Sequence, residues 1–264
     1  MLSSKKFKFK LSPSSQTQSS WKEIPGVGRI LHGTFSQSEI LSNFSGTQCA
    51  AASVAAIAYS QVVPVEYWTA STIDEIIIEG TRRHEKCNEK DDRGYADVRQ
   101  FFSQYVFETH GKQVYLQEGT GIAAIIQYYE SLSFVPLAQE VFTEFIDRKE
   151  NFCFVFNAFT LAVIMEQENV YLFNSHATGE TGEPCDFGRS CCVKMPITGA
   201  GDVIINIMRT NYFPEDLAAV KPANYTFCIT GVKAQVRKVF QASAIARKPA
   251  ITSGRTNNDF VMEN

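Results

Sequence analysis

The sequence predicts an α+β fold, in which a mostly helical first half is followed by a mostly antiparallel sheet. Two observations support this fold class. Residues 50–59 are almost pure Ala with Val and Ile, and apolar residues recur at helical spacing over 71–84 and 137–148. Residues 151–173 instead contain short runs of Val, Ile, Phe and Tyr separated by turn residues, a pattern typical of consecutive strands. At 264 residues and 44% hydrophobic content, the chain can build a sizeable core.

The two ends of the chain differ from the rest in composition. Residues 1–20 are rich in Ser, Lys and Gln and poor in side chains that could pack, and residues 247–264 are polar. We expect both segments to be disordered tails, because neither can bury enough apolar surface to offset the entropy of ordering. A single folded domain is expected over 21–246.

The elements of the first half follow from caps, turns and periodicity. Trp21–Pro25 begins the fold, and a strand over Gly26–Leu31 leads into a loop that carries Gln37. A glycine turn at Gly46 precedes the Ala-rich helix, with Thr47 as its predicted cap. We expect further helices over Ser71–His84, capped by Ser71 or Thr72, and over Tyr95–Phe107, Gly121–Ser131 and Leu137–Arg148, with a strand over Gln113–Gln117.

The second half is expected to be a sheet. Its predicted strands are Asn151–Phe156, Thr160–Met165, Val170–Phe173, Ser190–Lys194 and Tyr225–Val232, and the first three should be antiparallel neighbours because only short turns separate them. A helix is expected over Gly201–Tyr212. The glycine-rich segment Ala177–Arg189 is interpreted as a mobile loop.

Composition argues against two classes of partner. The formal net charge is -3 and no run of five or more basic residues occurs, so a nucleic-acid partner is not expected. The longest apolar stretches, Ala50–Ala58 and Phe152–Met165, are too short or too interrupted to span a bilayer, and no secretory signal follows the lysines near the start. Seven cysteines, an odd number, favour free thiols in a reducing, cytoplasmic compartment over a disulfide framework.

Cys49 is the first candidate for chemistry. It lies in the first turn of the Ala-rich helix, where unpaired backbone N–H groups and the helix dipole favour an anion. These groups should lower the pKa of the thiol and make it a nucleophile. The alternative is a small buried hydrophobe, because free cysteine is among the residues most often buried.

His176 is the histidine best placed to act with such a cysteine. Of the four histidines, His84 and His110 fall late in charged segments and are expected on the surface. His176 directly follows the strand Tyr171–Phe173, and alternation along a strand makes Asn174 and His176 point the same way. The amide oxygen of Asn174 can then orient the imidazole as a general base. Alternatively, these residues are a polar turn that ends the strand.

A cysteine that heads an early helix, followed by a histidine on a later sheet, is the arrangement of papain-like cysteine proteases. A zinc site is the alternative for this region, because Cys185, Cys191 and Cys192 lie close to His176 in the sequence. Structural zinc usually takes paired C-x-x-C knuckles, which these residues do not form. No metal is therefore expected.

Two short motifs carry a family resemblance. Gly46-Thr47-Gln48-Cys49, together with Tyr171-Leu172-Phe173-Asn174-Ser175-His176, resembles the ubiquitin-specific cysteine protease domain at the N-terminus of herpesvirus large tegument proteins and related tegument-type deubiquitinases outside herpesviruses. The resemblance extends roughly over Gly33–Lys194. In that family the cysteine follows a Gly-x-Gln motif, and the histidine closes a Phe-Asp-x-His motif.

The resemblance implies a role for each matching residue. Cys49 is the nucleophile, His176 the base, and Gln37 the oxyanion donor, with Gln48 as a competing candidate for the last role. The third catalytic residue is Asn174, where the family usually has Asp. An amide oxygen can still accept the imidazole N–H, as papain-like enzymes show.

The implied reaction is hydrolysis of the isopeptide or peptide bond after the C-terminal glycine of ubiquitin, without a cofactor. The implied partners are ubiquitin or polyubiquitin chains, and we expect a monomer that works in the cytoplasm, made there or delivered into a host cell. Two alternatives stay open. One is a cysteine protease or acyl transferase that acts on another ubiquitin-like modifier, and the other is a non-catalytic ubiquitin-binding protein.

Overall fold

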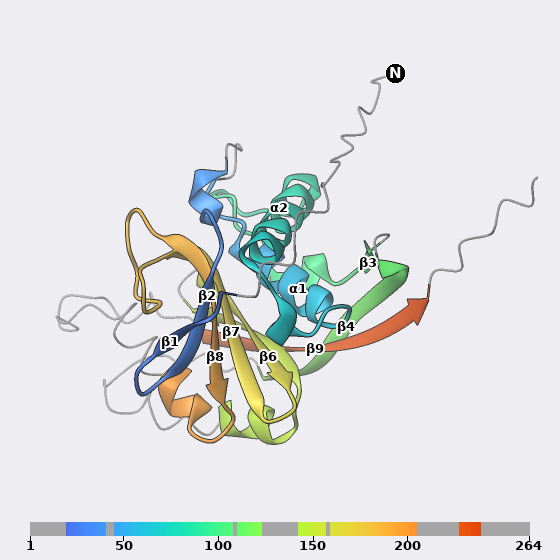
Figure 1. Cartoon of the computed structure of the whole chain (residues 1–264). Helices are drawn as coiled ribbons and strands as arrows, with labels where there is room; N and C mark the ends of the chain where they lie inside the picture. Colours follow the sequence, from blue (N-terminus) through green and yellow to red (C-terminus); the bar gives the residue numbers. More distant parts are fainter. Residues whose placement is uncertain are drawn as a thin grey trace, which may run out of the picture.

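A computed structural model of the chain describes residues 20–40, 45–107, 110–122, 142–156, 159–204 and 227–238. Within these residues the chain forms a large antiparallel sheet with two long helices, α1 (Cys49–Ser60) and α2 (Ala70–Lys86), on one face (Figure 1). Apart from residue 20, the predicted tails lie outside the described residues, as do most residues of the predicted helices over Gly121–Ser131 and Gly201–Tyr212. Gly121 and Ile122 end a strand rather than begin a helix. No described helix combines the length and the apolar content that a bilayer crossing requires.

In the part of the chain that the structure describes, the sheet has nine strands, and each strand is antiparallel to its neighbours. Some neighbouring strands come from opposite halves of the chain. In spatial order the strands are β1 (Lys22–Ile24), β2 (Gly28–His32), β8 (Arg189–Pro196), β7 (Asn169–Thr178), β6 (Phe159–Glu166), β5 (Asn151–Phe156), β9 (Phe227–Lys238), β4 (Lys112–Ile122) and β3 (Gln104–Phe107).

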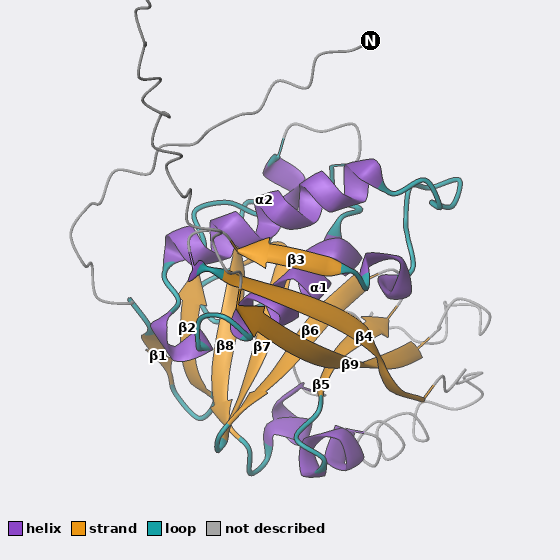
Figure 2. Cartoon of the chain, turned by 90° about the vertical axis from the view of Figure 1, so that its right-hand side faces the viewer, coloured by secondary structure: helices purple, strands orange, loops and turns teal. Residues whose placement is uncertain are grey.

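Both faces of the central strands are covered. One face packs against α1 and α2, and buries residues such as Ile164 and Phe173. The other face packs against Phe142, Phe145 and the helical segment 200–204, and buries residues such as Leu172. Figure 2 shows the sheet between α1 and α2 on one side and the helical segments at the bottom of the view. Because both faces of these strands are buried, nearly all of their residues are apolar. This explains the nearly continuous apolar runs in the sequence.

The α1 helix is buried almost all round, because it lies between the sheet and α2. Its small side chains let α2 approach closely. A Cβ added at Gly80 of α2 would lie 2.5 Å from the Cα of Ala52, so only glycine fits at this crossing. On the sheet side, the Ser53 hydroxyl donates a hydrogen bond to the Thr160 carbonyl (3.1 Å), which fixes α1 against β6.

The α+β fold with the Cys49 helix on a mostly antiparallel sheet is confirmed. The five predicted strands of the second half correspond to β5–β9, although β7 continues to Thr178 and β9 to Lys238. The strands predicted over Gly26–Leu31 and Gln113–Gln117 are β2 and β4. Residues 142–147 are helical, as expected for that part of Leu137–Arg148.

Two details of the first half differ from the prediction. The α2 helix is capped by Thr69 rather than by Ser71 or Thr72: Thr69 forms a reciprocal capping box with Thr72, in which the Thr69 side chain accepts from the Thr72 N–H. The segment Tyr95–Phe107 is not a helix. It forms a short 3-10 turn, η3 (Val98–Phe101), and then edge strand β3, because Tyr105 reaches the α1 layer from a strand paired with β4.

Candidate functional site

The approach to Cys49 is a tight turn. Gly46 has a φ of 88°, a conformation that residues with a side chain rarely adopt, and the α1 helix then begins at Cys49 with Gln48 at the cap position. The prediction that Thr47 caps this helix is therefore wrong. The Thr47 hydroxyl instead hydrogen-bonds Nε2 of His84 (3.2 Å), so α2 holds the turn before the cysteine.

His84 is fully buried rather than on the surface. Its ring stacks on Phe101, with the ring centroids 6.1 Å apart. Burial and the nearby charge of Lys90 lower the pKa of His84, and the backbone hydrogen bond with Gly94 acts in the opposite direction. The other histidine predicted to be on the surface, His110, is exposed.

Cys49 is 1% exposed, and its burial raises the pKa of the thiol. Hydrogen bonds from the hydroxyl and the backbone of Thr160, and from the backbone of Ala50, lower the pKa but do not outweigh burial. The expectation of a thiol with a lowered pKa is therefore wrong for this state. The helix start contributes in the predicted direction, but transfer of the sulfur out of water disfavours the thiolate more strongly.

Asn174 and His176 meet as predicted. The Asn174 Oδ1 atom lies 2.7 Å from Nδ1 of His176 and accepts the backbone N–H of His176 at 3.0 Å. Because a backbone N–H only donates, the atom that faces it is the amide oxygen, and Nδ1 must carry a hydrogen to complete the second bond. The acceptor lone pair of the neutral imidazole is then on Nε2. Both residues lie within β7, which continues to Thr178, rather than in a turn after the strand.

The His176 ring packs against Phe159, with centroids 4.7 Å apart. Burial lowers the pKa of His176 to about 4. The ring is therefore neutral at neutral pH, and Cys49 is a neutral thiol under the same conditions. Asn174 carries no charge that could favour the imidazolium, so the resting pair has the proton on sulfur.

Gln37 connects the turn before Cys49 to strand β7. It begins the short 3-10 turn η1 (Gln37–Glu39) and is 1% exposed. Its Nε2 amide donates to the Gly46 carbonyl (3.0 Å), and its Oε1 accepts from the Ser175 hydroxyl (2.9 Å). Gln48, the competing candidate, is also fully buried and lies at the cap of α1.

These contacts join Cys49 to β6 and Gln37 to β7, the neighbouring strand that carries Asn174 and His176. Thr160 contacts Cys49, its neighbour Phe159 contacts His176, and Gln37 joins Gly46 to Ser175. Three residues of this site were missed by sequence reasoning: Phe159, Thr160 and Ser175. Only Ser175 had a usable signal, because it lies between Asn174 and His176 and alternation sends it to the opposite face of the strand.

All seven cysteines are free thiols. Within the described ranges, no group of three or more His, Cys, Asp or Glu side chains is arranged to hold a metal ion. Cys191 and Cys192 are consecutive on β8 and pack into the cores on opposite faces of the sheet. They therefore do not converge on a common ligand.

The loop that follows β7 is closed by its own hydrogen bonds. The Gly179 N–H donates to the Glu183 carbonyl (2.7 Å), and His32 Nε2 lies 2.9 Å from the Gly179 carbonyl oxygen. Phe187 is 97% exposed in this loop. The loop begins close to His176, as expected, and its mobility stays a prediction.

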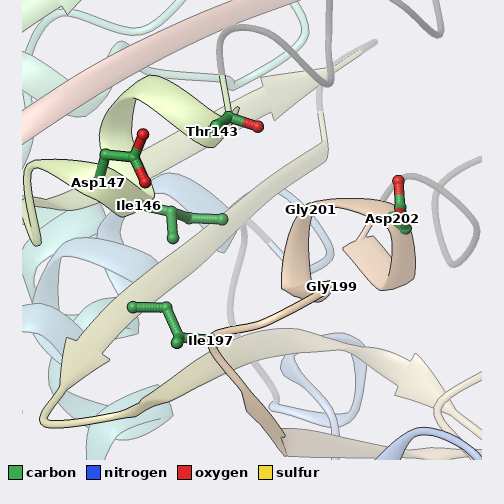
Figure 3. Close-up of a pocket in the computed structure, with 7 residues that line it drawn as sticks. All are labelled: Thr143, Ile146, Asp147, Ile197, Gly199, Gly201 and Asp202. Carbon is green, nitrogen blue, oxygen red and sulfur yellow. The ribbon is translucent and has the colours of Figure 1, made fainter.

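One pocket of about 260 Å³ lies away from this site. Figure 3 shows it between the helical segment 142–147 and the chain at 197–202, on the face of the sheet opposite α1. Its lining residues are Thr143, Ile146, Asp147, Ile197, Gly199, Gly201 and Asp202. None of the predicted site residues is among them.

Comparisons with known proteins bear on the fold and on the family of this chain. The fold is similar to the crystal structure of the ubiquitin-specific protease encoded by murine cytomegalovirus tegument protein M48, solved in complex with a ubiquitin-based suicide substrate. The TM-score is 0.57 at 13% identity, over 78% of this chain and 86% of that one, which confirms the predicted fold. No curated protein matches the sequence. Residues 34–233 match the model of the herpesvirus tegument protein N-terminal conserved region, so the chain belongs to that family.

Proposed function

We propose that this protein is a cysteine-type deubiquitinase, which hydrolyses the isopeptide or peptide bond after the C-terminal glycine of ubiquitin. The observation that carries the proposal is the bond between Asn174 and His176 (2.7 Å), on the strands against which the Cys49 helix packs. Ubiquitin is supported as the substrate by the structural relative, a ubiquitin-specific protease bound to a ubiquitin-based suicide substrate.

The reaction starts from the neutral pair. As the sulfur of Cys49 attacks the glycine carbonyl, His176 takes the thiol proton on Nε2 while Asn174 holds Nδ1–H. The hydroxyl and backbone of Thr160 stabilise negative charge on sulfur until the C–S bond forms. The oxyanion is held by the Gln37 amide and the Cys49 backbone N–H.

The tetrahedral intermediate then collapses to a thioester. The C–N bond breaks, and His176 gives its proton to the leaving lysine amine. Water attacks the thioester and loses a proton to His176, which returns that proton to the Cys49 sulfur as the C–S bond breaks. The C-terminus of ubiquitin leaves as a carboxylic acid and gives its remaining proton to solvent. Each step needs only side chains of this chain and water, so the reaction requires no cofactor.

Ubiquitin or polyubiquitin chains are the proposed partners, and the protein is proposed to act on them as a monomer in a reducing, cytoplasmic compartment. The seven free thiols support this setting, because none is used in a disulfide.

The test is a covalent ubiquitin probe with a C-terminal propargyl amide, compared with the same probe built on other ubiquitin-like modifiers. We expect the ubiquitin probe to label Cys49 and no other thiol. Cys49→Ala should abolish both labelling and hydrolysis of a fluorogenic ubiquitin substrate, with the fold intact because the change removes one sulfur. Cys185→Ser is the matched control, since this thiol is exposed. Turnover in Cys49→Ala would overturn the proposal.

A further inference from the structure

The three consecutive residues Asn174, Ser175 and His176 of β7 make two separate sets of contacts. Asn174 and His176 contact one another, as described above. Ser175 is fully buried, and its hydroxyl donates to Oε1 of Gln37 at 2.9 Å. The strand that carries the base therefore also contacts the side chain that prepares the oxyanion site.

The orientation of the Gln37 amide follows from its two partners. The Gly46 carbonyl can only accept, so the nitrogen end of the amide must face it, and the bond measures 3.0 Å. Ser175 holds the oxygen end. Nε2 carries two hydrogens, and the Gly46 carbonyl takes one of them. The second hydrogen is therefore available to an oxyanion, provided that the amide plane does not rotate.

We propose that Ser175 is a positioning residue for the oxyanion donor: through its hydroxyl it fixes the plane of the Gln37 amide, and it does not touch the substrate. The inference rests on the proposed function and deepens it. Loss of the hydroxyl would leave the Gln37 oxygen buried without this hydrogen-bond donor, which costs free energy. Rotation of the amide can reduce this cost. A rotated amide no longer presents its second N–H where the oxyanion develops.

The expected result is a loss of rate without a loss of binding. Ser175→Ala should lower kcat on a fluorogenic ubiquitin substrate by about 10-fold, the equivalent of one neutral hydrogen bond, with KM unchanged. Ser175→Thr, which keeps the hydroxyl, should restore kcat to within about threefold. Ser60→Ala is the matched control, because Ser60 is also buried and hydrogen-bonded, to the Ile57 carbonyl at the far end of α1. Its kcat should equal that of the wild type.

A double-mutant cycle separates positioning from a general structural role. If Ser175 acts only through Gln37, adding Ser175→Ala to Gln37→Ala should lower kcat by less than about twofold. Thermal unfolding of each variant checks the fold, and Ser175→Cys replaces Ser175→Ala in the cycle if the alanine variant does not fold. Additive losses, or a kcat in Ser175→Ala equal to wild type, would overturn the inference. A wild-type chain that hydrolyses no ubiquitin substrate overturns the proposed function and this inference together, whereas an active wild type with additive losses overturns only the inference.

Discussion

Single atoms of Asn174, His176 and Cys49 determine the protonation state of the site. The lowered pKa of His176 keeps the imidazole neutral, and the raised pKa of Cys49 keeps the proton on sulfur. A relative with Asp at position 174 would favour an ion pair instead, because a carboxylate stabilises the imidazolium that a neutral amide can only orient.

The substitution Asn174→Asp should keep or raise kcat/KM and move the acid limb of its pH profile to higher pH. The wild-type limb should fall below about pH 5, since the base is neutral down to its pKa of about 4. Asn174→Ala should lower kcat/KM by about 10-fold to 100-fold through loss of orientation, yet keep probe labelling at high pH, where Cys49 ionises without help. An Asn174→Ala profile identical to wild type would show that another side chain orients His176.

For the oxyanion donor, we expect Gln37→Ala to lower kcat by about 10²-fold to 10³-fold with little change in KM. Steady-state kinetics with a fluorogenic ubiquitin substrate measures both constants. Gln48→Ala is the matched comparison, because this glutamine is equally buried next to the nucleophile. A large loss in Gln48→Ala with Gln37→Ala near wild type would assign the role to Gln48.

Among the elements, helix α1 positions Cys49, and α2 determines where α1 lies. The crossing of the two helices depends on Gly80, which lies against the backbone of Ala52. One turn further along α2, His84 hydrogen-bonds Thr47. A change at this crossing should therefore move the cysteine without touching it.

The change Gly80→Ala should destabilise the fold by about 1–3 kcal/mol, because the new methyl group lies too close to the α1 backbone and the helices must separate. Urea unfolding gives the free energy, and kcat should fall in the same variant. Ile78→Ala on the same helix is the control, since Ile78 is 50% exposed and should change stability by less than about 0.5 kcal/mol. Equal stability of Gly80→Ala and wild type would show that the helices are not in close contact.

Across the whole molecule, the histidines with lowered pKa values link stability to pH. In the folded state the pKa values of His84 and His176 lie below the ordinary 6.5, so the unfolded chain takes up protons first as the pH falls. Their contribution to stability is therefore complete above about pH 6.5 and is lost as the pH falls toward 4.

We therefore expect the free energy of unfolding to decrease between pH 7 and pH 5. His84→Gln should make this decrease smaller, because only one of the two histidines with lowered pKa values remains to titrate. His110→Gln, at an exposed site, should not change it. Urea unfolding at both pH values measures the difference for each variant, and a decrease in His84→Gln as large as in wild type would show that His84 does not contribute.

Much of the architecture could be predicted because the central strands are covered on both faces and α1 is buried all round, and both conditions leave continuous apolar runs. The sequence predicts a helix over Tyr95–Phe107 because Val98, Phe101 and Tyr105 are spaced as in a helix. The second part of this segment is a strand instead, because β3 pairs with β4. The charged neighbours of His84 predict a surface position, which is wrong. Ile77, Gly80 and His84 lie on the same, buried face of the helix.

Contacts of the candidate site could be predicted from the sequence where the residues are close together along the chain. Asn174 and His176 are two residues apart on one strand, so alternation alone brings them together. The contact of Thr160 with Cys49 had no such signal, because it depends on how α1 lies on β6. The pKa of Cys49 was predicted in the wrong direction for the same reason: the helix start is visible in the sequence, but the depth of burial is not.

The pairing of β2 with β8 has a consequence for the time at which activity first arises. Leu31 is opposite Cys192, and Gln37, soon after β2, reaches Ser175. Such contacts close very long stretches of chain, which makes folding slow relative to helical proteins of similar size. During synthesis, the part of the chain that carries Cys49 leaves the ribosome long before the part that carries His176. The proposed catalytic residues therefore come together only after β7 has emerged and the second half has folded onto the first.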